Sequence, residues 1–558
     1  MASSDVGDVL AAFPRERQWL LPALHSLQHA LGWLPEAALA AAAAHLRVPA
    51  SEVHGVATHY PELRLRARGR HHVRVCAGVS CALLGGRELL AALARRLGMT
   101  PGEWPANALV SLEAADCFFE CSVGPLAEID GALHGRVTSD DVARVERWFA
   151  GHAAAAEPVG GAASPPRPVL SGLPGPGATQ VGSRVPASVV EEGTLPRRPR
   201  SAGSAQEALA GLVRAAEARS SSRPALRLLV QMGTCSRAVG GAELHAALRA
   251  EVERRGAAVE VVEGACNGAC WAAPSVEVSR AGWPRVMLER VTVDRAPALV
   301  DLLAGEGGDF AAAGFGGAAW SETAWRGLGP VAAHPFWRDQ TRVLLARAGA
   351  IDPGSLDDAL GTGAYRALGR ALDGPPAAVI DAVKASGLQG RGGAFFPAAL
   401  KWEACRNAGG QPKYVVMNGE EGEPGIFKDR HLMEGDPHRI LEGVLLAAYA
   451  SGAGSAILYV HGEADVSARR LAKAVDQARA AGLVGKRVLG TDFGCEVELR
   501  RGAGGFVLGE ETALLESIEG RQAQPRTRPP FPVEAGLWGR PTVINNVETL
   551  AAVPAILT

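Results

Sequence analysis

The chain has 558 residues, of which 47% are hydrophobic and 21% are charged, a balance that is ordinary for folded globular domains and excludes disorder as a description of the whole. At roughly 150 residues per domain, this length predicts three or four domains. Lysine and arginine (57) nearly balance aspartate and glutamate (59), so charge favours neither nucleic acid nor an anionic membrane surface as a partner.

The first 150 residues predict a helical stretch followed by a small α/β domain. Helical signals fill residues 8–60, including the alanine run 37–45. From residue 71 the pattern changes to a strand, a helix, a second strand and a hairpin, and Ser139 is placed to cap a short closing helix. The N-terminus has early acidic residues and no sustained apolar core, so we expect no secretory signal peptide.

The segment 151–222 is rich in Pro, Gly and Ala and poor in large apolar residues, which predicts a linker. Within it, residues 205–218 have a helical pattern. The next segment, 223–303, repeats the first domain, because a strand, a Cys, a Gly-Gly pair, a helix, a strand, Cys-x3-Cys, a hairpin and a closing helix follow in the same order. A period of about 150 residues indicates a duplicated domain rather than a solenoid.

A second Gly-rich linker, expected at 304–330, precedes the region 331–558, in which apolar strands alternate with helices. The long uncharged run 443–462 is broken by Gly and Ser, and we interpret it as a buried helix, a turn and a strand rather than a membrane span. The predicted fold class is therefore α/β, with two related small domains followed by a larger one.

The nine cysteines are too few for a disulfide-stapled secreted protein, and their clustering points to metal or redox chemistry. Cys76 and Cys81 follow one predicted strand, and Cys117 and Cys121 follow the next. Two such loops can bring four thiolates to one centre, which is the ligand count of a 2Fe–2S cluster. Structural zinc is the main alternative, and four buried thiols without metal are the other.

This cysteine pattern, after a helical stretch and on a strand–helix–strand frame, resembles the thioredoxin-like 2Fe–2S subunit of complex I, the 24-kDa type, over residues 8–150. The resemblance implies that both small domains are thioredoxin-like. It also implies one 2Fe–2S cluster, with Cys76, Cys81, Cys117 and Cys121 as its ligands.

The second copy keeps Cys235, Cys266 and Cys270, but Val230 stands at the position that corresponds to Cys76 and cannot bind iron. Either a group from outside the repeat completes a site, or the copy has lost its cluster and serves in packing and docking. We favour the loss, and expect no second cluster at these three cysteines.

Four segments of the last region carry residues suited to a phosphate, a ribose or a nicotinamide. The Gly-rich loop 390–394 precedes a predicted helix, whose N-terminus adds a favourable field for a phosphate. An acidic loop (417–430), a Gly-rich turn with paired glutamates (502–521) and a segment ending in paired amides (528–550) follow. Each segment alone is also explained as an ordinary turn or cap, whereas four in order favour a cofactor site.

Together these segments resemble the FMN- and NADH-binding subunit of complex I, the 51-kDa type, and the diaphorase subunits of NAD-linked formate dehydrogenases and hydrogenases, from about His334 to Thr558. The larger domain is therefore expected to be an FMN-binding α/β domain. The resemblance implies that FMN is bound by Gly390, Arg391, Gly392, Gly393, Lys401, Asn418, Glu420, Glu421, Gly509, Glu510, Asn545 and Asn546.

The same resemblance implies an NADH site beside the flavin. NADH is expected to stack on Phe396 and to meet Glu423, Glu511 and Phe531, with Arg528 near its phosphates. Of these, Glu511 and Phe396 are the predicted catalytic residues. The isoalloxazine ring accepts a hydride as one two-electron event and releases single electrons.

The sequence departs from the family pattern at five positions. Phe395 stands where the family loop has Gly, Glu420 replaces an Asp, and Phe506 replaces a Tyr near the flavin. Ala404 replaces an expected aromatic residue, and Arg528 replaces a Lys, which keeps the charge but changes its geometry. Family members continue into a ubiquitin-like domain and a 4Fe–4S domain, so we expect residues 331–558 to be truncated before those regions.

These patterns predict a diaphorase subunit that transfers hydride between NAD(H) and FMN, and single electrons to iron–sulfur centres of a larger complex. The expected partners are other iron–sulfur and dehydrogenase subunits, with no nucleic acid and no membrane insertion, and the expected location is the cytoplasm. One alternative is a non-catalytic assembly subunit that keeps the fold without flavin chemistry. Another is a simple 2Fe–2S electron carrier.

Overall fold

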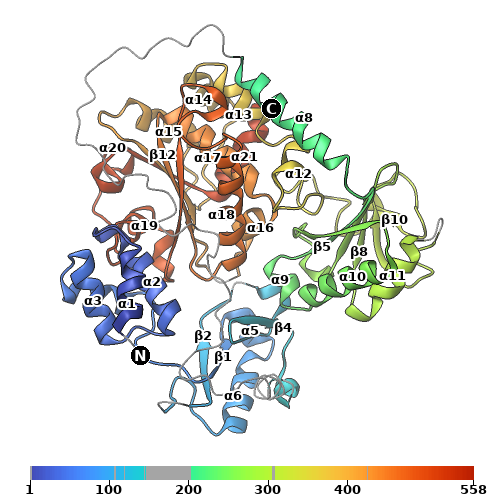
Figure 1. Ribbon diagram of the computed structural model, residues 1–558, viewed down its shortest axis with the longest axis horizontal. Helices are drawn as coiled ribbons and strands as arrows, with labels where there is room; N and C mark the ends of the chain where they lie inside the picture. The colour runs from blue at the N-terminus through green and yellow to red at the C-terminus, as the bar shows by residue number, and fades with distance from the viewer. Residues whose placement is uncertain are drawn as a thin grey trace.

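The computed structural model describes residues 3–105, 108–118, 120–143, 145, 203–304, 308–423 and 425–558. These residues form four helices at the N-terminus (the N-terminal helices), a first domain around one sheet, a second domain around another, and a C-terminal domain, residues 331–558. Figure 1 shows the C-terminal domain beside the other three parts. Most of the linker expected at 151–222, and part of the helix expected after Ser139, lie outside the described residues.

The N-terminal helices pack against the C-terminal domain rather than covering the first sheet. Their buried leucines, among them Leu24 and Leu27, share one apolar core with Ile457, Leu508 and Leu514 (Figure 1). The structure thus joins to the C-terminal domain a stretch that we expected to belong to the first domain. The helices are α1 (Ser3–Ala11), α2 (Leu20–Leu31), α3 (Glu36–Leu46) and α4 (Ala50–His59).

Glu62 lies where the N-terminal helices meet the C-terminal domain. Its backbone N–H donates to the Ala503 carbonyl at 3.1 Å, and among the described residues its buried Oε1 atom has no hydrogen-bond partner. Burial, together with the nearby Glu463 carboxylate, raises the pKa of Glu62 from 4.5 to about 8. The folded chain therefore binds this proton more tightly than the unfolded chain does.

The raised pKa of Glu62 predicts that the stability of the folded chain depends on pH. The stabilisation from protonated Glu62 is complete below about pH 4.5 and is lost as the pH rises to about 8. We expect Glu62→Gln, which keeps the shape without the charge, to raise the free energy of unfolding at pH 9 by about 1–3 kcal/mol and to change it little at pH 5. Thermal unfolding at both pH values measures this, with the exposed Glu36→Gln as control. Equal shifts at the two pH values would contradict it.

The first domain is a four-stranded sheet of order β2-β1-β3-β4. Strands β1 and β2 are parallel and connected through helices, whereas β1 pairs antiparallel with β3, which turns through Asp130 and Gly131 into β4. This confirms the predicted strand–helix–strand–hairpin pattern. The elements are β1 (His71–Cys76), α5 (Val79–Leu83), α6 (Gly86–Leu97), β2 (Val110–Ala115), β3 (Leu126–Ile129) and β4 (Ala132–Gly135).

The second domain repeats this arrangement and then extends it. Strands β6, β5, β7 and β8 have the order and directions of β2, β1, β3 and β4. Two further strands, β9 and β10, continue the sheet beyond β8. The elements are β5 (Leu226–Gln231), α9 (Thr234–Arg237), α10 (Gly241–Arg255), β6 (Val259–Gly264), β7 (Val276–Arg280), β8 (Val286–Glu289), α11 (Ala296–Ala304), β9 (Gly316–Ala319) and β10 (Gly329–Pro330).

Both added strands lie within the segment 304–330, which the sequence suggested was a linker. The glycines serve close strand packing instead, because a Cβ atom on Gly317 would lie only 1.9 Å from the Met287 carbonyl oxygen. Gly317 also has a φ of +147°, which side chains rarely adopt. A Gly-rich composition here therefore marks a strand at close approach.

The C-terminal domain is built on a fully parallel sheet of order β13-β12-β11-β14. The run 443–462 forms a buried helix, a left-handed turn at Gly452 and a buried strand, as predicted. The strands are β11 (Tyr414–Gly419), β12 (Ser455–Val460), β13 (Glu496–Arg501) and β14 (Thr542–Asn546).

Helices pack around this sheet, and α17 and α21 lie so close that a Cβ on Gly443 would meet the Leu550 carbonyl at 2.1 Å. Helix α8 (Ala205–Ser220), predicted within the linker, packs on α12 and α13 of this domain. The other helices are α12 (Leu356–Gly361), α13 (Arg366–Leu372), α14 (Pro376–Ala385), α15 (Ala398–Asn407), α16 (Lys428–Gly435), α17 (Pro437–Ser451), α18 (Asp465–Ala480), α19 (Glu511–Ile518), α20 (Pro532–Ala535) and α21 (Val547–Leu557).

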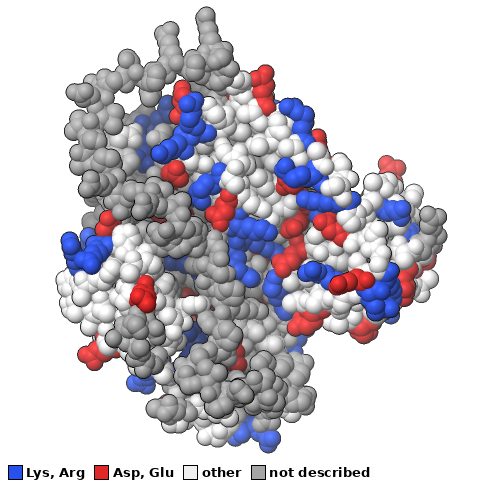
Figure 2. Space-filling view, in the orientation of Figure 1, with Lys and Arg blue, Asp and Glu red and all other residues white. Residues whose placement is uncertain are grey.

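Basic and acidic side chains are interspersed on the face shown in Figure 2, in line with the near-zero net charge of the chain. In the part of the chain that the structure describes, no helix is long and apolar enough to cross a bilayer.

Candidate functional site

The first domain brings its four predicted cysteine ligands together. Cys76 ends β1, Cys81 lies in α5, Cys117 follows β2, and Cys121 begins a short 3-10 turn. The Cys76 thiol contacts those of Cys81 and Cys117, and the Cys81 thiol interacts with those of Cys117 and Cys121. The first three residues are buried and Cys121 is half-buried.

Glycines make room for these sulfur atoms. A Cβ on Gly124 would lie 3.1 Å from the Cys81 sulfur, and one on Gly78 would lie 3.4 Å from the Cys117 sulfur. Four convergent thiols in a cradle that side chains would fill fit a 2Fe–2S cluster with all-Cys ligation.

The predicted cofactor residues of the C-terminal domain gather at the carboxyl ends of its parallel strands, where ligands of open α/β sheets bind. Asn418 lies at the end of β11, and its side-chain amide donates to the Gly509 carbonyl at 2.9 Å. Asn545 and Asn546 end β14, and Asn545 accepts a hydrogen bond from the Trp402 indole at 2.8 Å. The ends of β11 and β14 form one edge with three loops, which are the Gly-rich loop 390–394, the acidic loop after β11 and the loop that contains Gly509. This edge is called the cofactor edge.

The Gly-rich loop 390–394 lies against the N-terminus of α21. The Arg391 N–H donates to Thr549 Oγ1 at 2.9 Å, and a Cβ on Gly392 would lie 3.3 Å from Asn546. Asn546 caps α21 by accepting the Glu548 N–H at 3.0 Å. The loop therefore runs over a helix N-terminus, the kind of site that binds phosphate.

Phe395, which stands where the family pattern has Gly, adopts a left-handed backbone with a φ of +53°. Its ring points into solvent and is 57% exposed. The loop thus keeps the backbone conformation that a glycine would favour, while the added ring extends the exposed surface.

Two cations and two carboxylates form a network at the start of α19. Glu511 accepts hydrogen bonds from Lys401 Nζ and from Arg528 Nη1, both at 2.9 Å. Glu510 caps α19 by accepting the Thr512 and Ala513 N–H groups, and it also pairs with Arg528 at 3.0 Å. All four charged residues were predicted from sequence, and the structure brings them together.

The acidic loop after β11 divides its three glutamates between the interior and the surface. Glu420 is buried and pairs with His461, where the carboxylate outweighs burial and raises the pKa of that imidazole. Its second oxygen, Oε2, is buried without a hydrogen-bond partner among the described residues. Glu421 is also buried and accepts the Asp429 N–H at 2.9 Å and the Arg430 N–H at 3.1 Å, whereas Glu423 is exposed.

Exposed aromatic rings border the cofactor edge. Phe396 is 53% exposed and Phe531 is 51% exposed, and the rings of Phe395 and Phe506 also face solvent. Large apolar side chains at such exposure mark a binding surface. Flat ring faces suit the stacking of a flavin or a nicotinamide.

Helix α16 contains functional residues that the sequence analysis did not single out. Lys428 donates to Asn546 at 3.0 Å and pairs with Asp429, which itself accepts from Asn546. Arg430 forms a buried ion pair with Glu120 and donates to the Phe118 carbonyl at 3.4 Å. Lys428, Asp429 and Arg430 lie within the quoted acidic loop, and Glu120 lies between Cys117 and Cys121, in the loop called here the first cysteine loop. The pairing of Arg430 with Glu120 joins positions about 310 residues apart.

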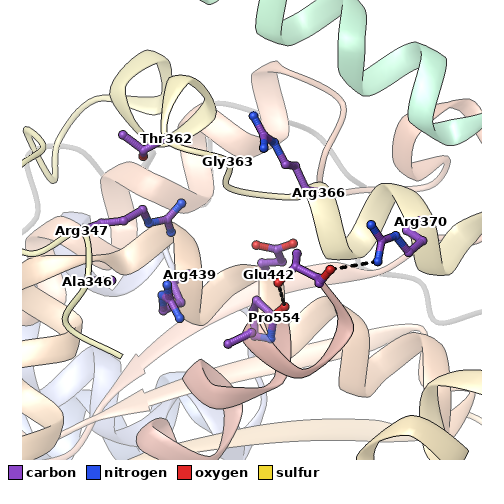
Figure 3. A pocket seen from close by; sticks show the side chains of 11 residues that line it. Ala346, Arg347, Thr362, Gly363, Arg366, Arg370, Arg439, Glu442 and Pro554 are labelled. Atoms are coloured by element: carbon purple, nitrogen blue, oxygen red, sulfur yellow. Dashed lines mark hydrogen bonds between the residues drawn. The ribbon is translucent and has the colours of Figure 1, made fainter. Parts of the chain in front are cut away.

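A separate pocket of about 380 Å³ lies near the end of α21 (Figure 3). Arg347, Arg366, Arg370 and Arg439 surround Glu442 there, and Arg370 donates to the Thr558 carbonyl at 3.1 Å. None of the predicted cofactor residues lines this pocket.

Comparisons with known proteins match the two parts of the chain that contain these residues. Residues 6–147 match the family model of the thioredoxin-like [2Fe-2S] ferredoxins, and residues 383–555 match that of the Nuo51 FMN-binding domain. One segment of the chain is thus similar to each of these two families. The 24-kDa-type and 51-kDa-type resemblances seen in the sequence are thereby confirmed, as is the α/β fold class.

Curated relatives match a part of the chain. The chain is 45% identical over 220 residues to the HndC subunit of the NADP-reducing hydrogenase of Solidesulfovibrio fructosivorans, and 47% identical over 217 residues to an NADH-quinone oxidoreductase subunit of Aquifex aeolicus. Each match covers 39% of this chain, and 45% and 50% of the respective relatives. The chain spans about half the length of the curated relatives it matches.

A solved structure shares the fold over nearly the whole chain. A NAD+-reducing [NiFe]-hydrogenase in the H2-reduced state superposes with a TM-score of 0.55 at 21% identity, covering 98% of this chain and 62% of the other. At this identity the likeness concerns the fold, which includes the second domain that neither family model covers.

Proposed function

We propose that this fusion of a 2Fe–2S ferredoxin domain and an FMN-binding domain is a diaphorase subunit. It transfers hydride between NAD(H) and FMN, and single electrons to iron–sulfur centres. The observation that carries the proposal is the cofactor edge, where a Gly-rich loop, a helix N-terminus, paired acids and exposed rings converge.

FMN fits the residues at this edge. The glycines of 390–393 let backbone N–H groups approach a phosphate beside the N-terminus of α21. The unpartnered Glu420 Oε2 and the side chain of Asn418 offer hydrogen-bonding groups to ring or ribitol atoms. When bound, the flavin supplies the exchange between two-electron and one-electron chemistry.

NADH would bind along the exposed aromatic residues that border the cofactor edge, which form its rim. Phe396 and Phe531 offer ring faces for stacking, and Arg528 offers a cation to the dinucleotide phosphates. Glu511, held between Lys401 and Arg528, is placed to accept a hydrogen bond from the carboxamide or ribose.

Helix α16 connects this edge to the first cysteine loop. Lys428 and Asp429 contact Asn546 at one end, and Arg430 contacts Phe118 and Glu120, between two of the cysteine ligands. This helix therefore holds the cluster-binding loop against the flavin-binding domain, as electron transfer between the two would require.

The same reasoning extends to partners and location. Both named relatives are subunits of larger enzymes, and we infer that this chain works with other iron–sulfur and dehydrogenase subunits. A cytoplasmic location is part of the proposal, because all nine cysteines are free and free thiols are typical of reducing compartments.

Anaerobic addition of NADH to the FMN-loaded full-length chain tests this function. We expect the flavin absorption to bleach, and the 2Fe–2S absorption to decrease with it. Phe396→Ala should raise the NADH concentration needed for half-maximal bleaching by about 5–150-fold, since stacking on an aromatic side chain contributes about 1–3 kcal/mol. Leu109→Ala, which also removes an exposed apolar side chain (61% exposed), is the matched control.

The possible outcomes separate the alternatives. A chain that binds no FMN, or whose FMN does not respond to NADH, would instead be an assembly subunit or a simple 2Fe–2S carrier. A Phe396→Ala variant with unchanged NADH dependence would leave the activity standing but move the NADH site away from this rim.

A further inference from the structure

The three cysteines of the second domain converge on one point. The sulfur atoms of Cys235, Cys266 and Cys270 all lie within 4.8 Å of one another, and all three residues are buried. They come from two separate segments, because Cys235 lies in α9, whereas Cys266 and Cys270 both lie in the connection between β6 and β7. Thiols that converge on one point from separate segments can act together as ligands of one metal ion.

A fourth potential ligand comes from the C-terminal domain. The Nε2 atom of His431 lies 3.2 Å from the Cys270 sulfur, and this imidazole also interacts with the Cys266 thiol. His431 is in α16, about 161 residues further along the chain, and so lies outside the repeat. Three cysteines and one histidine form one of the standard ligand sets of structural zinc.

The arrangement favours a single ion over a second 2Fe–2S cluster. In a tetrahedral zinc site with Zn–S bonds of about 2.3 Å, neighbouring sulfur atoms lie about 3.8 Å apart, within the spacing seen for these three. The cluster of the first domain uses Cys76, the last residue of β1, whereas the equivalent strand β5 ends at Gln231 and not at the Val230 expected from the sequence alignment. Gln231 is buried and supplies an amide instead of a thiolate. His431 instead contacts the Cys-x3-Cys pair.

The surroundings also suit bound metal. The Gly268 N–H donates to the Cys266 sulfur at 3.3 Å, an outer-shell contact that stabilises a metal thiolate. Gly233 allows the segment before Cys235 to approach α16 and Cys266 closely, because a Cβ there would lie 2.9 Å from a Glu434 oxygen and 3.4 Å from the Cys266 Cβ.

We propose that Cys235, Cys266, Cys270 and His431 bind one zinc ion, which fastens the second domain to helix α16. The same helix face continues the contact, since Glu434 accepts the Thr234 N–H at 2.9 Å. Zinc has no redox chemistry, so its role here is structural. The zinc ion would hold α16 through His431, whereas Lys428 and Asp429 of the same helix contact the cofactor edge.

Metal analysis of the full-length chain tests the site independently of any flavin activity. We expect one zinc and two irons per chain after anaerobic purification. Growth with Co2+ should give the visible absorption of tetrahedral cobalt thiolate. His431→Ala should lower the retention of zinc under a chelator at least tenfold, and His431→Cys should restore it. Cys405→Ala, which removes a buried cysteine of α15 outside both groups, should leave zinc unchanged.

Four irons and no zinc would overturn the proposal in favour of a second binuclear cluster. Two irons and no other metal would show that the three thiols and the imidazole only hydrogen-bond. If His431→Ala fails to fold, the wild-type zinc count, the cobalt spectrum and the His431→Cys variant still decide.

Discussion

Replacing Arg430 by methionine is expected to weaken the contact between α16 and the first cysteine loop by about 3–5 kcal/mol. The Arg430 and Glu120 side chains are 6% and 3% exposed, so the substitution leaves a carboxylate buried without its cation. The loop 117–123 should then open more often. Hydrogen exchange of that loop, and the rate at which NADH reduces the 2Fe–2S cluster, measure the effect.

A second substitution separates the pair from general damage. The double variant with Arg430→Met and Glu120→Leu should regain most of the lost stability, because replacing a buried ion pair by apolar residues is often neutral. Arg254→Met, which breaks an exposed pair with Glu251, should leave loop exchange unchanged. Equal exchange in the single and double variants would show that the charge of Glu120 is not the cause.

Replacing Cys81 by alanine is expected to remove the 2Fe–2S cluster completely. Three thiolates cannot complete the ligation of two irons, so iron per chain should fall by two and the visible absorption of the cluster should disappear. Bleaching of the flavin by NADH should remain, because Cys81 lies in α5, outside the cofactor edge. Iron analysis and absorption spectra of the reduced and oxidised chain provide the measurement.

Cys405→Ala is the matched control. Burial raises the pKa of the Cys405 thiol to about 11, which disfavours the thiolate that binds metal, and the residue packs within the apolar core of the C-terminal domain. It should lose no iron. A Cys81→Ala variant that keeps two irons would mean that the first domain binds its metal through other residues.

Elements and local motifs were predictable because their signals lie in short stretches of sequence. The duplicated strand–helix–strand–hairpin pattern, the buried run 443–462 and helix 205–218 all appear in the structure. Here residue type and spacing determine the local backbone. The structure also places the Cys76 thiol against those of Cys81 and Cys117. It joins Lys401, Glu511 and Arg528, which the family resemblance singled out one by one, in a network that was not predicted.

Contacts between distant segments were not predictable from the same signals. An amphipathic helix shows that it has an apolar face but not which partner covers it, so the packing of the N-terminal helices on the C-terminal domain came only from the structure. Gly-rich composition suits both a linker and a strand at close approach, and the Met287 carbonyl beside Gly317 decides between them.

The sequence by itself showed the resemblance to two domain families and the duplication, because each motif occupies a few neighbouring positions. The proposed cofactor residues followed from that resemblance. Only the tertiary structure decided how the motifs meet. Four consecutive residues of α16 reach the cofactor edge, the first cysteine loop and the thiols of the second domain. Folding brings together positions that lie hundreds of residues apart, and the spacing of residues within a short motif does not predict such contacts.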